Sequence, residues 1–380
     1  MKNSYKLLEN RESSHKRKKQ GGVFVYKTTA KTIDLIEINK ILNYIVDVKN
    51  SAFISQSPIR IDLSFAQKFE DKLSYIIFEC LCYELIVHKN CNLKVVFNCK
   101  HNILNEGIKY SFLKEINTIS KKTLIQKFDF DIFGAHYRKK VSYENQNPSI
   151  VSIVTQDVYN FLKCININDD ARWKISEVAS ELIDNALFHS KSDCLIDIDI
   201  TNDYNKNNSD KKYYGINIVA IDFSSILFAD GLAEILNSND NILKSGRYEE
   251  VLKAKANHTE FFDDKYDESQ FYCITAFQNK ISSRKTEGTG GTGLTRLIKQ
   301  LQDDSDSNKC YMISGNNMVK LFKNYMELNS DGWIGFNKSN DYIHLAPDKQ
   351  CVCKSPIYIP GTTYHLTFIR EKEDLENGEN

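Results

Sequence analysis

No uninterrupted apolar stretch in this chain of 380 residues is long enough to cross a membrane. The best run, residues 76–88, contains Glu79 and Glu84, and a spanning helix needs roughly 18 apolar residues. An excess of one charge is also missing, because 50 lysines and arginines balance 50 aspartates and glutamates. We therefore expect no membrane partner, and contact with nucleic acid only where basic residues cluster locally.

The cysteines lack the spacing of a metal or redox site. Among the ten cysteines the only close pairs are Cys80/Cys82 and Cys351/Cys353, and neither has the Cys-x-x-Cys spacing of a zinc knuckle or a thioredoxin-like centre. No signal peptide precedes them, so we expect reduced structural thiols in a cytoplasmic protein.

The chain shows no solenoid repeat, and its length exceeds that of one ordinary core, so we predict two domains between two tails. Residues 1–22 are predicted to be a disordered arm, with a basic run at 15–19 that is either solvated or contacts nucleic acid. Residues 371–380 are predicted to be a disordered acidic tail. The folded domains are predicted at 23–145 and 149–370, joined by a polar linker that ends at Pro148.

The first domain alternates strand and helix signals. Strands are predicted at 59–63 and 93–98, with a helix at 71–88 between them, and this alternation indicates a small α/β domain. The pattern from Pro58 to Ser64, followed by a long apolar helix and a strand, resembles STAS-like regulatory domains. An unrelated α/β domain explains the same pattern.

The second domain begins with helices and continues into strands. A helix at 173–189 places an apolar face opposite a polar stripe, and the alternation at 194–200 predicts a half-buried strand with Asp197 and Asp199 in solvent. Further strands are predicted at 215–222 and 360–368. The region 228–269 is predicted to form a helical lid.

The polar stripe of the helix carries the most specific motif. Glu177, Glu181, Asn185 and His189 are spaced by four residues, so they share one helix face. The string 181–189 resembles the N box of the GHKL (Bergerat-fold) ATPase superfamily. The resemblance implies that Asn185 gives its amide oxygen to Mg²⁺ and that Glu181 is the base that activates the attacking water.

A second matching element is Asp222, at the end of a predicted strand. In GHKL proteins an aspartate at this place accepts a hydrogen bond from the adenine amino group, so the resemblance assigns that role to Asp222. The sequence departs from the family here, because the usual Asp-x-Gly-x-Gly reads Asp222-Phe-Ser-Ser-Ile226. Side chains in place of these glycines are expected to reshape the pocket.

The third element is the glycine-rich stretch 288–295, which leads directly into a predicted helix. Such a turn presents free amide groups to an anion, and the sequence has no Walker motif. The stretch resembles the second glycine box of the superfamily. The implied phosphate-binding residues are Gly288, Gly290, Gly291, Thr292, Gly293 and Leu294. Lys285, or its neighbour Arg284, either reaches the phosphates or lies in solvent, and residues 361–363 resemble the entry to the strand beside adenine.

The resemblance implies a two-layer α/β sandwich with a mixed, mostly antiparallel sheet, and ATP and Mg²⁺ as ligands. The expected function is a slow ATPase whose cycle switches the lid and a protein partner or a second copy, in the manner of a subunit of a bacterial multi-protein defence system. Two alternatives stay open. One is a protein kinase of histidine-kinase or anti-sigma type, with Ser64 as a conceivable acceptor, and the other is a non-catalytic interaction module.

Overall fold

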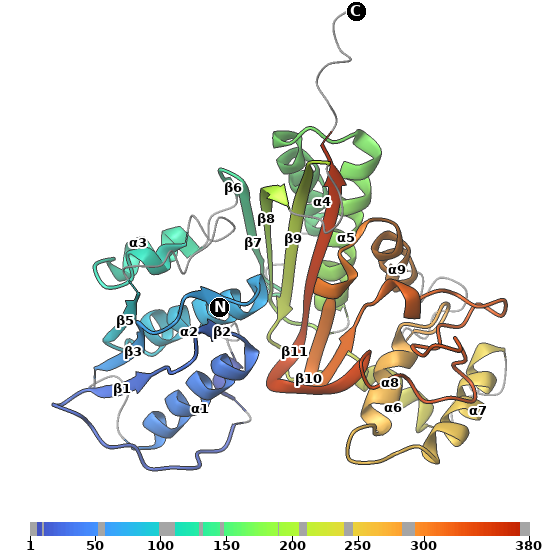
Figure 1. Cartoon of the computed structure of the whole chain (residues 1–380), viewed down its shortest axis with the longest axis horizontal. Coiled ribbons are helices and arrows are strands. Elements are labelled where there is room, and N and C mark those ends of the chain that lie inside the picture. Colours follow the sequence, from blue (N-terminus) through green and yellow to red (C-terminus); the bar gives the residue numbers. More distant parts are fainter. Residues whose placement is uncertain are drawn as a thin grey trace, which may run out of the picture.

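The computed structural model describes residues 6–9, 11–51, 58–98, 111–128, 132–144, 148–188, 190–204, 211–238, 246–282 and 293–372. Within these ranges the chain has a mixed α/β fold, as the sequence predicts. Figure 1 shows the N-terminal part (blue) on one side of a tall central sheet, with a group of helices on its other side.

The central sheet has six strands in the order β10-β11-β9-β8-β7-β6, and all neighbouring strands are antiparallel. The strands are β6 (Ile132–Phe133), β7 (His136–Val141), β8 (Cys194–Tyr204), β9 (Tyr213–Asp222), β10 (Tyr311–Lys320) and β11 (Val352–Glu371). The sheet thus includes β6 and β7, which lie within the range predicted for the first domain. The predicted boundary near residue 145 therefore falls too late, because β7 pairs with β8 across residues 136–141.

One face of the sheet, called here the inner face, is covered by three helices. They are α4 (Ile150–Phe161), α5 (Asp169–Phe188) and α9 (Gly293–Asp304). The predicted apolar side of α5, with Leu182 and Ile183, packs on Ile196, Ile198 and Ile218 of the sheet in one buried cluster. Burial of this face anchors α5, and Glu181 on its polar stripe lies toward α9, where it meets Arg296.

The opposite face, the outer face, is covered by the N-terminal domain. Its parallel sheet has the order β1-β3-β5, with strands β1 (Phe24–Lys27), β3 (Ile59–Leu63) and β5 (Leu93–Phe97). A short pair, β2 (Thr32–Ile33) and β4 (Lys68–Phe69), and the helices α1 (Leu35–Ser51), α2 (Lys72–Tyr83) and α3 (Lys121–Phe128) complete it. Helices α1 and α2 contact β11 and β9, and Leu195, Val219 and Ile221 of the large sheet share a buried cluster with this domain.

The predicted helix at 71–88 is interrupted within the N-terminal domain. Asp71 is the N-cap of α2 and accepts a hydrogen bond from the Ser74 amide at 2.8 Å. The last part, Glu84–His88, is a π-helical segment. The α-helix is therefore one turn shorter than the apolar pattern predicts.

The outer face also carries a cluster of buried charges, called here the outer ionic cluster: Lys72, Glu79, Arg138, Asp197 and Asp199. Arg138 donates to Asp197 at 2.5 Å and to Glu79 at 2.5 Å, and Lys72 Nζ lies 2.6 Å from Asp197 and also bonds Asp199. Although burial alone would raise it, the nearby Arg138, His136 and Lys72 hold the pKa of Asp197 well below its usual range. The cluster joins α2 to β7 and β8 across the two domains.

The prediction that Asp197 and Asp199 face solvent is therefore wrong. Asp197 is 0% exposed and Asp199 is 3% exposed. Both sides of β8 are buried, because Lys72 lies 127 residues away in sequence and brings a cation onto the strand face that looked solvated.

The basic arm also differs from its prediction. Residues 11–17 lie along α1, and the buried carboxylate of Asp47 accepts hydrogen bonds from Ser13, from the backbone amides of residues 14 and 15, and from Arg17. Arg11 donates to the carbonyl of Tyr358 on β11 at 2.8 Å, which links the arm to the large sheet. The sequence predicts disorder here because a basic run does not indicate which distant carboxylate binds it.

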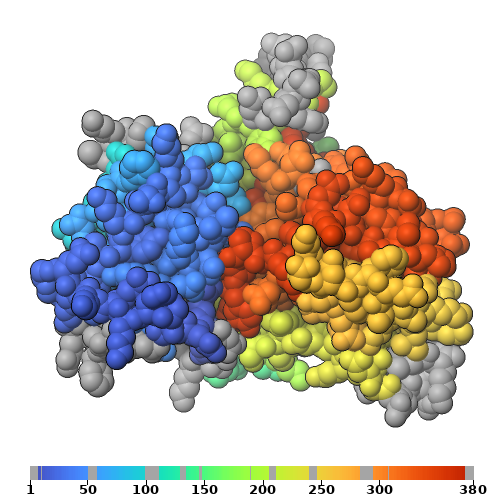
Figure 2. Space-filling view, turned by 60° about the horizontal axis from the view of Figure 1, so that its bottom comes forward, coloured from blue at the N-terminus to red at the C-terminus, as the bar shows by residue number. Residues whose placement is uncertain are grey.

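The predicted helical lid is a packed accessory lobe. Helices α6 (Asp230–Leu236), α7 (Arg247–Thr259) and α8 (Glu268–Ala276) enclose a core with the irregular segment 321–351. Trp333 stacks on Tyr342 with ring centroids 5.0 Å apart, and Arg247 lies over the indole at 3.7 Å. Figure 2 shows α7 and α8 (yellow) against the 321–351 segment (red), beside the blue N-terminal domain.

None of the helices in the described ranges is both long enough and apolar enough to cross a membrane. The cysteines in these ranges are free thiols, and burial raises the pKa of most of them, for example that of Cys273 to about 12. They are therefore protonated at neutral pH.

Candidate functional site

The candidate site lies on the inner face, where α5, α9, the end of β9 and the middle of β11 meet. Helix α5 contacts both α9 and β9, and α9 contacts β11. The described site residues from the sequence, Glu181, Asn185, Asp222, Gly293 and Leu294, belong to these elements. Gly288, Gly290, Gly291, Thr292, Lys285, Arg284 and His189 lie outside the described residues.

Helix α5 presents its polar stripe along the edge that faces α9. Glu181 is partly buried, and one of its carboxylate oxygens lies 3.7 Å from a guanidinium nitrogen of Arg296 on α9. Glu177, one turn earlier, is exposed. The pair ties the two helices loosely, since Arg296 is 64% exposed and water screens its charge.

Asn185 lies one turn after Glu181 and is partly buried. Its side-chain nitrogen is inaccessible to solvent and has no hydrogen-bond partner among the described residues. A buried amide without a partner is uncommon in a folded protein, because each missing bond costs about 1–3 kcal/mol. The amide nitrogen is therefore a donor whose partner is not found in the described part of the chain.

Asp222 ends β9 and is 5% exposed. Its carboxylate accepts a hydrogen bond from the Ser190 hydroxyl at 3.0 Å and one from the Ser224 amide at 3.2 Å. Burial raises the pKa of this carboxyl to about 6, against the opposing effect of these hydrogen bonds. No basic side chain donates to it among the described residues, in contrast to Asp197. The backbone amide of Thr362 is a further donor to the carboxylate, so the groups that stabilise its charge are all neutral.

Gly361 on β11 closes over the carboxylate of Asp222. Its φ is +76°, and an added Cβ would lie 2.0 Å from Asp222 Oδ1 and 2.7 Å from the backbone oxygen of the same residue. Only glycine fits here, for both conformational and steric reasons. The sequence indicates residues 361–363 as the entry to a strand, but they lie within β11, which already begins at Val352. Thr363 pairs with Ile221, the residue before Asp222.

The loop after Asp222 is held by side chains where glycines were expected. The Ser224 hydroxyl donates to the carbonyl of Ile226 at 2.6 Å and accepts from its amide at 3.1 Å. Ser314 on β10 then accepts from the Phe228 amide at 2.9 Å and donates to the Gly361 carbonyl at 2.8 Å. These bonds fix a turn that keeps Ser224 and Ile226 near the carboxylate.

Helix α9 begins at Gly293, so it starts within the glycine-rich stretch 288–295 and not after it, and Gly293 and Leu294 belong to the helix. Leu294 is partly buried, and the Thr295 hydroxyl bonds the Asn279 side chain at 3.3 Å. The first amide groups of a helix have no partner inside the helix and attract anions, so the start of α9 has the polarity that a phosphate requires.

Sequence reasoning missed Ser190 and Ser314. Ser190 follows directly on the 181–189 motif, but its contact with Asp222 depends on the pairing of β8 with β9. Ser314 offered no signal, because its role depends on the pairing of β10 with β11.

Searches against protein-family models, curated proteins and solved structures found no match for this chain.

Proposed function

We propose that the chain binds ATP with Mg²⁺ on the inner face and hydrolyses it slowly, in the manner of GHKL ATPases. The observation that carries the proposal is that α5, whose Asn185 amide nitrogen has no partner among the described residues, packs against β9, which ends in a buried carboxylate closed over by Gly361. The two groups suit the opposite ends of a nucleotide. A carboxylate accepts from an adenine amino group, and an amide oxygen suits a hard cation beside phosphates.

In this proposal Asn185 holds Mg²⁺ through its amide oxygen, and the bound cation offsets charge on the phosphates. The start of α9, with Gly293 and Leu294, receives the phosphates through its free amides. The glycines and Lys285, predicted earlier in the same loop, are proposed to extend this cradle. Asp222 holds the adenine amino group, while Ser190 and Ser224 orient its carboxylate.

Glu181 is the proposed base. It lies one helical turn from Asn185, where its carboxylate can accept a proton from water near the γ-phosphate. Its present neighbour, Arg296, is a surface side chain at 3.7 Å. Such a pair is weak, so the carboxylate is able to leave it when nucleotide and metal arrive.

Non-catalytic binding is the second candidate, and two observations favour it. The Glu181–Arg296 pair engages the proposed base, and the Ser224 turn occupies the position of the expected glycines. Phosphotransfer to Ser64 of the same chain has no such support, because the N-terminal domain covers the outer face and the proposed pocket is on the inner face. A protein partner or a second copy is proposed as the recipient of any nucleotide-driven change.

Product analysis with γ-labelled ATP separates these functions. We expect free phosphate from the unaltered protein, and a fall of roughly a hundredfold in Glu181→Gln with nucleotide affinity retained. Glu177→Gln, on the exposed turn before it, is the matched control and is expected to hydrolyse normally. Bound but unchanged ATP would favour the non-catalytic function, whereas labelled protein would favour a kinase.

A further inference from the structure

Tyr364 lies on the same face of the sheet as Asp222, one strand away. It pairs with Ala220 on β9, and Asp222 is two residues further along that strand. Side chains two residues apart on a strand point to the same face, and diagonal neighbours on adjacent strands lie within reach of an aromatic side chain. Tyr364 is therefore a neighbour of the carboxylate proposed to bind adenine.

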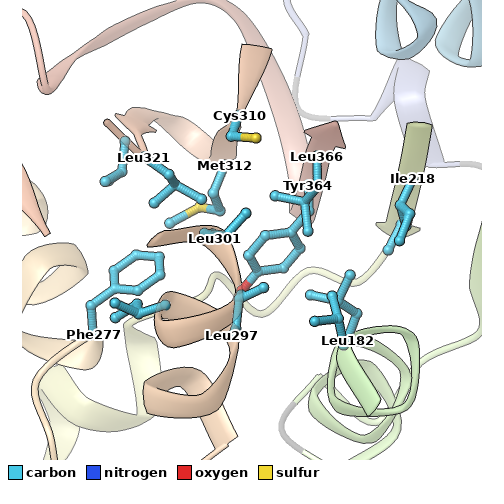
Figure 3. Packing of buried hydrophobic residues seen from close by; sticks show 14 of the residues in the cluster. Leu182, Ile218, Phe277, Leu297, Leu301, Cys310, Met312, Leu321, Tyr364 and Leu366 are labelled. Carbon is cyan, nitrogen blue, oxygen red and sulfur yellow. The ribbon is translucent and has the colours of Figure 1, made fainter. Parts of the chain in front are cut away.

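The hydroxyl of Tyr364 is buried without a partner. The residue is 4% exposed, and its hydroxyl makes no hydrogen bond within the described part of the chain. Figure 3 shows the phenol ring between α5 and α9, with its oxygen beside Leu297 and with Leu182 across from it. Phe228 meets the ring edge-on at 6.4 Å.

Packing explains why an aromatic ring lies at position 364, but it does not explain the hydroxyl oxygen of Tyr364. A phenylalanine would fill the same volume among Leu297, Leu182 and Phe228 and would leave no polar group unsatisfied. The hydroxyl also keeps its proton at neutral pH, because burial and, to a smaller extent, the negative charge of Asp222 raise its pKa. It is therefore able to donate a hydrogen bond. The tyrosine therefore offers a donor on the same sheet face as the Asp222 acceptor, and this donor has no partner among the described residues.

We propose that the Tyr364 hydroxyl donates a hydrogen bond to a ring nitrogen of the bound adenine, as a second base-reading contact beside Asp222. This inference rests on the proposed function. The adenine edge presents an amino donor flanked by two acceptor nitrogens, N1 and N7. A carboxylate next to a hydroxyl donor is the complementary pair, with Asp222 accepting from the amino group and Tyr364 donating to its neighbour.

The test is calorimetric titration of Tyr364→Phe with Mg-ATP, 1-deaza-ATP and 7-deaza-ATP, where each analogue lacks one acceptor nitrogen. We expect Tyr364→Phe to bind ATP about fivefold to tenfold more weakly than the unaltered protein, as loss of one hydrogen bond implies. One analogue is expected to bind the unaltered protein more weakly by a similar factor. Tyr364→Phe and the unaltered protein are then expected to bind that analogue with the same affinity.

Tyr342→Phe is the matched control, because its hydroxyl bonds Thr275 at 2.7 Å in the accessory lobe, away from the site. We expect it to leave nucleotide affinity unchanged. Thermal unfolding checks that Tyr364→Phe is folded, and we expect no loss of melting temperature, since the hydroxyl bonds none of the described residues.

Unchanged ATP affinity in Tyr364→Phe would overturn the inference and leave the proposed function standing. An equal loss for ATP and both analogues would also overturn it, since the tyrosine would then act through packing. No ATP binding by the unaltered protein would instead overturn the proposed function and the inference with it.

Discussion

The buried polar groups on the two faces of the central sheet differ in the partners that the protein supplies to them. On the outer face every member of the outer ionic cluster has an oppositely charged partner, and Arg138 alone bonds both Glu79 and Asp197. On the inner face the Asn185 amide nitrogen and the Tyr364 hydroxyl have no partner among the described residues. Asp222 there has hydroxyl and amide donors, and its pKa is raised, whereas that of Asp197 is lowered.

The contrast distinguishes polar groups that are buried to hold the fold together from polar groups that are buried to bind a ligand. Two aspartates on neighbouring strands are equally buried, yet the protein supplies cations to Asp197 and none to Asp222 in the described ranges. A charge that is fully compensated specifies how two domains meet. A polar group that is left incomplete costs stability unless something else completes it, and this is common at binding sites. The comparison therefore supports a ligand site on the inner face.

The largest expected effect on stability comes from a substitution in the outer ionic cluster, where each charge has an oppositely charged partner. Arg138→Met leaves Glu79 and Asp197 buried without their shared cation, and we expect a loss of about 3–5 kcal/mol in the free energy of unfolding. Denaturant unfolding measures it. Lys253→Met, which removes an exposed pair with Glu249, is the control and is expected to cost less than about 1 kcal/mol. A loss of similar size in both variants would mean that the outer ionic cluster is not special.

The reverse effect is expected on the inner face, where Asp222→Asn should stabilise the fold at neutral pH. The carboxyl is ionised less readily in the folded state, with a pKa of about 6 against 3.8 as the ordinary value. As the pH rises from about 4 to 6 the unfolded chain loses its proton first, so this group lowers stability progressively and by at most roughly 3 kcal/mol above pH 6.

The stability difference between Asp222→Asn and the unaltered protein is therefore expected to be near zero at pH 4 and to grow up to pH 7. Thermal unfolding across this range measures the difference. A variant that is less stable than the unaltered protein at pH 7 would show that the carboxylate is a structural group like Asp197. The same variant is expected to lose most of its preference for ATP over GTP, because the amide no longer offers a charged acceptor.

Asn185→Ala is expected to have a smaller effect, confined to binding. Its amide nitrogen has no hydrogen-bond partner among the described residues, so we expect a change of less than about 1 kcal/mol in unfolding free energy. The affinity for ATP in magnesium is expected to fall by roughly tenfold, and the affinity measured in the presence of a chelator is expected not to change. A loss of stability with unchanged affinity would assign Asn185 to the core.

Much of the inner face could be predicted from sequence because its signals are local. The apolar face of α5, the strand that ends at Asp222 and the helix after the glycine-rich stretch all follow from periodicity and turn chemistry. The positions of Glu181 and Asn185 on one stripe follow from the helical repeat. The short distance from Asp222 to Ser190 and Gly361 does not, because it depends on which strands become neighbours.

The outer face could not be predicted in the same way. The alternation in 194–200 correctly indicates a strand, but Asp197 and Asp199 look like a solvated face until Lys72 and Arg138 are placed beside them. Residues 11–22 look mobile until Asp47 is placed against them. In both regions the missing information is a partner far away in sequence, and charge alone does not say whether one exists.

Calorimetric titration of the unaltered protein with ATP and with GTP, each in magnesium, tests the central claim most directly. If Asp222 reads the adenine amino group, ATP is expected to bind on the order of a hundredfold more tightly than GTP, since the carboxylate would face the carbonyl oxygen of guanine. Equal affinities for the two nucleotides, or no binding of either, would contradict the account and remove Asp222 from a nucleotide pocket.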